Sequence, residues 1–157
     1  MARMMTAVAM AAGLMCSGAV AADLAEHHTA SDLAKTTEGL KAKAAKTGSA
    51  SETLAEYTSH RTVLSYRAAN GGAEVHTHVA DIFYIVHGKA SLVTEGKVEN
   101  GHEEKPDEIR GSAVTGGKTM LLTAGDVVHI PAGVPHQILV SKGDEIVYFV
   151  VKVTEKE

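Results

Sequence analysis

Histidine and acidic side chains that could hold a metal lie close together near the middle of the sequence. His76 and His78 are separated by one residue, and Asp81 follows them closely. Residues two apart in a β-strand project from the same face of a sheet, so the two imidazoles could share a divalent ion. A His-x-His pair alone is a weak signal, because a pair on the protein surface is the commoner explanation.

A further histidine ends a segment that is rich in glycine and proline. The segment reads GDVVHIPAGVPH over residues 125–136, so its last residue is His136. Several imidazoles with one carboxylate suit the divalent metals Fe, Mn, Ni, Cu or Zn, whereas Ca and Mg prefer oxygen ligands. The single cysteine, Cys16, cannot form a thiolate-rich zinc site or an internal disulfide. A metal bound by this chain must therefore be held by histidine and carboxylate.

Together the two segments resemble the two motifs of the cupin superfamily, the small double-stranded β-helix or jelly-roll barrels. The first motif is His-x-His, an acid, six residues and Gly, and it is matched at His76, His78, Asp81 and Gly88. The second is a Gly, five residues and Pro-x-Gly-x-x-His, and it is matched at Gly125, Pro131, Gly133 and His136. The resemblance covers roughly residues 61–153.

The resemblance implies that His76, His78 and His136 are metal ligands, and that Asp81 takes the place of the family's acidic ligand. The family more often has Glu there, with a longer spacing than the two residues that separate Asp81 from His78. Asp81 is therefore either a direct ligand or a hydrogen-bond partner of a ligating histidine. The cavity is expected to be lined by Phe83, Ile85, Ile138 and Val140, while His129 could face the cavity or the solvent.

The elements that must position these residues are short and β-rich. After Thr58 the chain alternates β-type runs with turn signals of Gly, Asn and Asp. We expect eight strands in an all-β cupin double-stranded β-helix (jelly-roll barrel), over residues 61–67, 73–78, 82–86, 90–94, 119–123, 127–130, 137–140 and 145–153. Residues 95–118 are polar and contain Pro106, and we expect a long loop or insertion there.

The N-terminal residues 1–22 have the pattern of a secretory signal peptide. Arg3 precedes an apolar run that ends in Ala-Val-Ala-Ala. A membrane anchor is the alternative, but the run is rich in Ala and Gly and short for a span of about 20 residues. We therefore predict cleavage near Ala21 or Ala22, a periplasmic or secreted protein, and no stable membrane insertion after cleavage.

Residues 23–58 are expected to form a helical, partly disordered lead-in to a barrel domain of residues 59–157. Ser31 and Asp32 could cap a first helix that stops before Gly48. Ser49 with Glu52 three residues later is a possible capping box for a second short helix.

Composition narrows the function further. The formal net charge is −4 and no basic stripe is present, which argues against a nucleic-acid partner. We expect a periplasmic metal-binding cupin, a metal-dependent enzyme of oxygenase, isomerase or lyase type acting on a small polar organic molecule. The alternative is a non-catalytic periplasmic module that binds a small molecule or metal, because apart from Asp81, Tyr84 or His129 no proton-transfer residue is evident. The family resemblance also implies a homodimer.

Overall fold

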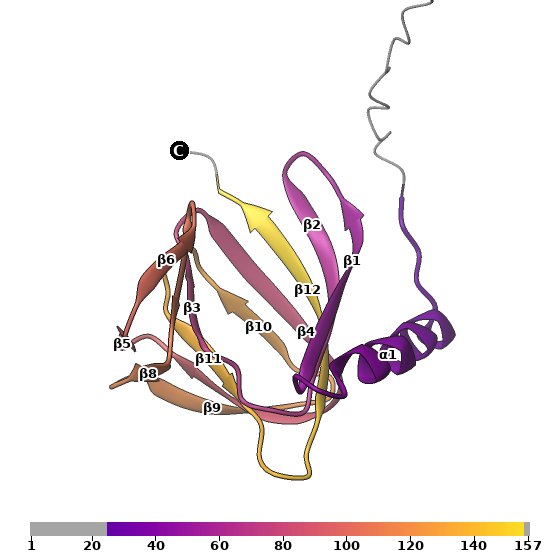
Figure 1. The fold of residues 1–157 in the computed structure, drawn as a ribbon. Helices are drawn as coiled ribbons and strands as arrows, with labels where there is room; N and C mark the ends of the chain where they lie inside the picture. Colours follow the sequence, from indigo (N-terminus) through magenta and orange to yellow (C-terminus); the bar gives the residue numbers. More distant parts are fainter. Residues whose placement is uncertain (1–24, 156–157) are drawn as a thin grey trace, which may run out of the picture.

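A strongly curled antiparallel sheet forms most of the molecule. The computed structural model describes residues 25–155, so the predicted signal peptide lies outside the described residues. The main sheet has ten strands. Eight run in the order β1-β2-β12-β4-β11-β3-β7-β6, while β9 and β10 also pair with β4. Figure 1 shows the sheet closing toward itself, with β1 and β2 on one side and β3 and β6 on the other.

The elements have the following bounds. They are α1 (Ala30–Ala44), β1 (Ser49–Glu56), β2 (His60–Arg67), β3 (Ala73–His76), β4 (Val79–Thr94), β5 (Lys97–Glu99), β6 (His102–Lys105), β7 (Glu108–Gly111), β8 (Ala113–Thr115), β9 (Lys118–Thr123), β10 (Val127–Ile130), β11 (His136–Leu139) and β12 (Ile146–Thr154). Among the described residues, no helix is long and apolar enough to cross a membrane.

Helix α1 docks against the outside of the sheet. Its N-cap is Thr29, which forms a capping box with Asp32 and so begins the helix two residues before the predicted cap at Ser31. Leu40 is fully buried against a cluster that includes Leu64 and Val147. The helix ends before Gly48, as predicted, and the N–H of this glycine donates to the carbonyl of Ala44.

The second helix expected from Ser49 and Glu52 is wrong, because these residues form strand β1. The strand pairs with β2 from Ser49↔Arg67 to Glu56↔Arg61. The hydroxyls of Ser51 and Ser65 lie 2.9 Å apart across the pair. Pairing with a long neighbouring strand satisfies many backbone groups at once, and this tertiary gain outweighs a local capping pattern.

The loop expected over residues 95–118 is also wrong, since it contains four short strands. β5 pairs with β8, and β6 pairs with β7. Three residues at tight turns beside these strands have left-handed φ angles, namely Glu95 (66°), Asn100 (52°) and Asp107 (65°). Asn and Asp tolerate this conformation better than most side chains, so a polar sequence can form compact hairpins.

Strand β4 merges two of the predicted strands. It runs for 16 residues and pairs with β9, β10, β11 and β12. Gly88 lies within it with a positive φ of 79°, and a Cβ there would lie 1.9 Å from the carbonyl oxygen of Glu145. Gly88 is the Cα partner of Ile146, and the register with β12 shifts just before it, between the pairs Tyr148↔Ile85 and Val147↔His87. Up to Gly88 the strand pairs with β12, and beyond it with β9 and β11.

The apolar core fills one part of the barrel interior. It contains Ile85, Leu92, Ile130 and Ile146, each at most 2% exposed. The interior between β2, β3, β11 and β12 is instead polar, and it contains the candidate site.

Candidate metal centre and cavity

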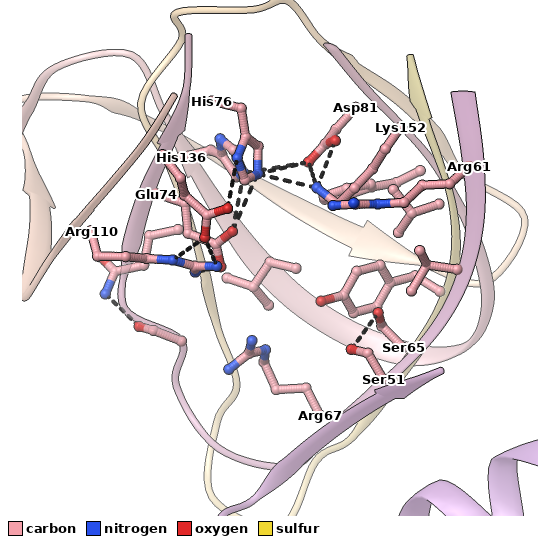
Figure 2. Close-up of a pocket in the computed structure, with 18 of the residues that line it drawn as sticks. Ser51, Arg61, Ser65, Arg67, Glu74, His76, Asp81, Arg110, His136 and Lys152 are labelled. Carbon is pink, nitrogen blue, oxygen red and sulfur yellow. Dashed lines mark hydrogen bonds and ion pairs between the residues drawn. The ribbon is translucent and has the colours of Figure 1, made fainter. Parts of the chain in front are cut away.

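A cavity of about 430 Å³ lies inside the curled sheet. Its apolar wall is formed by Val63, Phe83, Ile138, Tyr148 and Val150. The rest of its surface is mostly polar, with charged, imidazole, hydroxyl and amide side chains, several of which Figure 2 labels. This volume falls within the roughly 300–1,000 Å³ range typical of small-molecule sites.

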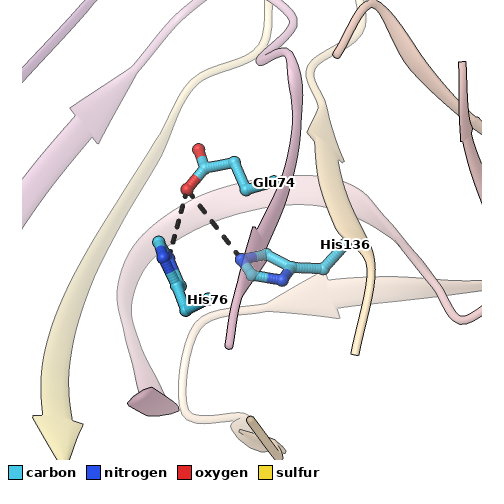
Figure 3. Close-up of side chains that lie close together, drawn as sticks. All are labelled: Glu74, His76 and His136. Carbon is cyan, nitrogen blue, oxygen red and sulfur yellow. Dashed lines mark ion pairs between the residues drawn. The ribbon is translucent and has the colours of Figure 1, made fainter. Parts of the chain in front are cut away.

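Two histidines and one glutamate converge at one end of this cavity. Glu74, His76 and His136 each offer one ligand atom, and the three atoms lie within 4.8 Å of one another. Glu74 Oε2 lies 3.5 Å from His76 Nε2 and 4.0 Å from His136 Nε2. Figure 3 shows the carboxylate facing both rings. We call these three residues the Glu-His-His group.

Strand geometry brings the Glu-His-His group together. Glu74 and His76 are two apart on β3 and therefore share the face that points into the cavity. His136 begins β11 and is the Cα partner of Glu74. The turn before β11 is tied to β3, because the N–H of Gly133 donates to the carbonyl oxygen of His76 over 2.7 Å. Gly133 has a φ of 77°, which a residue with a Cβ adopts only with strain.

The outer nitrogens of both imidazoles have partners that orient the rings. His136 Nδ1 lies 3.1 Å from the carbonyl oxygen of Val134, and His76 Nδ1 lies 3.7 Å from Glu108 Oε2. A neutral ring that carries its proton on Nδ1 presents the lone pair of Nε2 to the cavity, which is the form that binds a metal. Ligands about 2.1 Å from a metal are roughly 3.0–3.4 Å apart, so a modest contraction of this group would suit a transition metal.

Arg110 holds the carboxylate of Glu74 from the side opposite the histidines. Its Nη1 lies 2.5 Å from Glu74 Oε1, while its Nε donates to Glu108 Oε1 over 2.6 Å. Burial raises the pKa of Glu74, but a hydrogen bond from His76 and the charges of Arg110 and His136 outweigh it and lower the pKa to about 2. Glu74 is therefore a carboxylate at neutral pH.

His136 is held in the neutral form that a metal ligand requires. Burial is the largest influence and lowers the pKa of His136, against the opposing influence of Glu74 and Asp81. Its side chain is only 5% exposed. A buried, neutral imidazole with a directed Nε2 is a suitable donor for a divalent transition metal.

Asp81 lies beside the Glu-His-His group but is engaged by a lysine. Its Oδ2 is 3.5 Å from His76 Nε2 and 3.7 Å from His136 Nε2. Lys152 Nζ donates to both Asp81 oxygens over 2.8 Å and lies 3.1 Å from His76 Nε2. Asp81 is thus near enough to act either as a further ligand or as the group that positions Lys152.

The structure does not bring His78 into the group. Strand β3 ends at His76, and the N–H and hydroxyl of Thr77 both donate to Asp107. The chain bends there, so His76 shares a face of the strand with Glu74, two residues before it, and His78 lies beyond the end of the strand. The His78 side chain is 45% exposed, with Nε2 3.5 Å from Asp107 Oδ1.

The residues predicted to line the cavity divide into three groups. Phe83 and Ile138 do line it. Ile85 and Val140 are buried in the apolar core and are not among the residues that line this cavity. His129 lies on the exposed face of β10, whose neighbours Val128 and Ile130 face inward.

Sequence reasoning missed Glu74 and the five basic residues of the cavity wall, namely Arg61, Arg67, Lys105, Arg110 and Lys152. Alternation could have found two of them. Glu74 is in phase with His76, and Lys152 is in phase with the inward-facing Tyr148 and Val150 on β12. Arg110 comes from the segment that was predicted to be a loop.

Comparisons with known proteins connect this geometry to one fold. No protein-family model matches the chain, and no curated protein matches it. Solved structures do match, among them the DMSP lyase DddQ from Ruegeria pomeroyi DSS-3, with 20% identity and a TM-score of 0.51. The match covers 69% of this chain and 48% of the lyase, so the chain spans about half of that protein.

Two further solved structures have a similar fold. The cupin domain of Schizosaccharomyces pombe Cnp3 is 13% identical with a TM-score of 0.52, and the match covers 70% of this chain and 67% of that one. The polyketide cyclase RemF from Streptomyces resistomycificus is 18% identical with a TM-score of 0.51, over 69% of this chain and 67% of that one. The chain therefore has the cupin fold, and the fold predicted from the two motifs is confirmed.

Proposed function

We propose that this cupin-fold chain is a metal-dependent enzyme that acts on a small polar organic molecule. The observation that carries the proposal is the convergence of Glu74 Oε2, His76 Nε2 and His136 Nε2 at one end of a cavity of about 430 Å³. Two imidazoles and a carboxylate are donors for Fe, Mn, Ni, Cu or Zn. A lyase and a cyclase among the proteins of similar fold support an enzymatic role.

The chain's own residues define the chemistry that this end of the cavity can support. A metal held by the Glu-His-His group would supply a Lewis acid that polarises a carbonyl or hydroxyl of the substrate. Arg110 keeps Glu74 ionised and fixed in orientation. Lys152, held by Asp81 at the edge of the group, can deliver a proton from Nζ to a substrate atom. Phe83 and Val150 form part of an apolar wall that limits the access of water. These groups favour a lyase or isomerase reaction.

The alternative is a non-catalytic module that binds a small molecule or metal. The observation in its favour is that Lys152 donates hydrogen bonds to both oxygens of Asp81. This pairing holds Lys152 in place, so that it can contact a bound ligand without transferring a proton. Both functions need the Glu-His-His group. The test is to incubate metal-loaded protein with candidate hydroxy acids, keto acids and diols and to record turnover and oxygen uptake. Turnover with oxygen uptake indicates an oxygenase, turnover without it a lyase, and no turnover a binding module.

Elemental analysis tests the metal site directly. Protein purified without a His-tag is expected to contain, or to take up after reconstitution, close to one transition metal per chain. The His76→Ala and His136→Ala variants are expected to lose it, whereas His78→Ala is the matched control that removes an exposed histidine and keeps it. Wild type that cannot be reconstituted would refute the metal site, and equal metal loss in His78→Ala would restore the set predicted from the sequence motif.

We further propose that the mature protein is periplasmic or secreted and forms a homodimer. The signal-peptide pattern of residues 1–22 supports export. The outer face of the sheet supports self-association, because the paired residues Tyr84 and Val127 are 48% and 67% exposed and Ile82 lies beside them. The mass of the protein recovered from the periplasm tests cleavage near Ala22. Light scattering of Val127→Asp against wild type tests the dimer.

A further inference from the structure

Strand β2 places two arginines in the cavity that holds the Glu-His-His group. Alternate residues of β2 face inward, namely Arg61, Val63, Ser65 and Arg67. Figure 2 shows Arg61 on the side of Lys152 and Arg67 at a distance from it. The cavity is therefore basic at both places, although the whole chain carries a net charge of −4.

The charges that line the cavity do not balance. Five basic side chains line it (Arg61, Arg67, Lys105, Arg110 and Lys152) against three acidic ones (Glu74, Asp81 and Glu108), which leaves 5 − 3 = +2. Lys105 and Arg110 form ion pairs with Glu108, and Lys152 forms one with Asp81. The surplus thus falls on the two arginines of β2. A divalent metal on the Glu-His-His group would add to it.

Arg61 faces another cation across the sheet. It is the Cα partner of Lys152 on β12, and both side chains line the same cavity. Like charges directly opposite one another on a sheet are destabilising. Glu56 is the partner of Arg61 on β1, yet within residues 25–155 no carboxylate forms an ion pair with Arg61 inside 4.0 Å. Asp81 neutralises Lys152, so the charge that remains at this place is that of Arg61. An anion bound beside Arg61 and Lys152 would neutralise it.

Arg67 presents an unneutralised guanidinium farther along β2. Its Nε is buried and has no hydrogen-bond partner in the part of the chain that the structure describes. Its guanidinium interacts with Tyr148, whose hydroxyl stays neutral because burial raises the pKa of Tyr148. The absence of a side chain at Gly71 leaves room for this guanidinium, since a Cβ there would lie 3.0 Å from Arg67 Nη1.

We propose that the cavity binds a small organic acid with two carboxylates, one held by Arg67 and the other between Arg61 and Lys152 beside the Glu-His-His group. A guanidinium matches a carboxylate in shape and charge and can bond it through two N–H groups. The walls between the two positions include Val63, Phe83 and Val150, which suit a short carbon chain. The proposal deepens the proposed function, and it rests on that function only for the role of the metal at one end.

Calorimetric titration of chelator-treated protein tests the charge preference without the metal. The probes are the dicarboxylates succinate, glutarate and adipate, each compared with its neutral diamide. We expect at least one dicarboxylate to bind at least tenfold more tightly than its diamide, because charge-assisted hydrogen bonds are the stronger class. Equal affinity for the diamide, or no binding of any dicarboxylate, would overturn the proposal.

Matched variants locate the binding site. Arg61→Gln and Arg67→Gln are each expected to weaken the dicarboxylate at least tenfold, while Arg67→Lys keeps part of the affinity. Lys142→Gln removes a charge from an exposed turn and is expected to leave the affinity unchanged. Circular dichroism confirms that each variant is folded, and Arg67→Lys serves in place of Arg67→Gln if the latter does not fold. Wild-type affinity in folded arginine variants would refute the site.

The same titrations separate this inference from the proposed function. His136→Ala removes a metal donor without changing either arginine. One outcome is that the protein never takes up metal, yet chelator-treated wild type and this variant both bind the dicarboxylate. That outcome would refute the metal-dependent function and support the anion site. The opposite outcome is a protein that takes up metal but binds the dicarboxylates no more tightly than their diamides. It would refute the anion site and leave the metal-dependent function supported.

Discussion

The Glu74→Gln variant is expected to lose stability in a way that depends on pH. The pKa of Glu74 falls from 4.5 to about 2 in the folded protein, against the effect of burial, through His76, Arg110 and His136. At roughly 1.4 kcal/mol per pH unit, this fall corresponds to about 3 kcal/mol of stability. Glutamine has nearly the shape of the protonated acid, so the variant removes the contribution of the charge. The side chain is 20% exposed, so solvent screening takes only a small part of it.

The direction of the pH effect follows from the sign of the shift. A carboxyl group with a lowered pKa in the folded state stabilises the protein fully above its unfolded value, here 4.5, and loses this contribution as the pH falls toward about 2. We therefore expect Glu74→Gln to be up to about 3 kcal/mol less stable than wild type at pH 7, since the part contributed by the charge of His136 is present only while that imidazole is protonated. The difference should fall to roughly half near pH 3 and to a few tenths of a kcal/mol near pH 2, where about half of the folded Glu74 is still ionised.

Urea unfolding followed by far-UV circular dichroism measures this difference, because the chain has no tryptophan to report by fluorescence. Both proteins are treated with chelator, so that metal binding does not add to the stability of wild type. Glu103→Gln on the exposed strand β6 is the matched control and should lie within about 0.5 kcal/mol of wild type. A loss below about 1 kcal/mol at pH 7, or the same loss at pH 7 and pH 3, would refute the assigned electrostatics.

Further predictions concern Asp81, α1 and the bend in β4. Asp81→Asn should greatly weaken metal binding if Asp81 is a ligand and only slightly if it positions Lys152, as competition with a metal indicator measures. Leu40→Ala should cost about 2–5 kcal/mol in urea unfolding, since Leu40 is fully buried beneath α1. Gly88→Ala should lower the melting temperature more than Gly125→Ala. Both glycines have a positive φ, but a Cβ at Gly88 would collide with the backbone of Glu145, whereas a Cβ at Gly125 would have no atom within 4 Å.

The parts of the site carried by the second motif could be predicted from sequence. Gly125 and Gly133 adopt φ angles of 94° and 77°, which is why glycine is needed at these turns. The turn at Gly133 brings His136 to the start of β11, directly opposite Glu74. The glycine turns and His136 lie within twelve consecutive residues of the motif, so the spacing between Gly125, Gly133 and His136 is enough to determine the position of His136.

The position of His78 could not be predicted from the same reasoning. The spacing indicates a shared face only while the strand continues, and β3 ends at His76. Asp107 determines that end, since it accepts hydrogen bonds from the N–H and the hydroxyl of Thr77. Asp107 belongs to a segment that the sequence indicated to be a loop, so nothing near His78 signalled the bend.

The charge of the cavity depends on a register between strands that are distant in sequence. Arg61 and Lys152 become neighbours only because β2 and β12 pair from Arg67↔Ile146 to His60↔Val153. A slip of one residue in β12 would turn Lys152, Val150 and Tyr148 away from the cavity. The apolar residues in this phase, Tyr148 and Val150, are buried, and their burial determines the register. The core thereby places Arg61 opposite a lysine that Asp81 already neutralises, and the remaining charge of Arg61 at the wall of the cavity is the physical reason to expect an anion there.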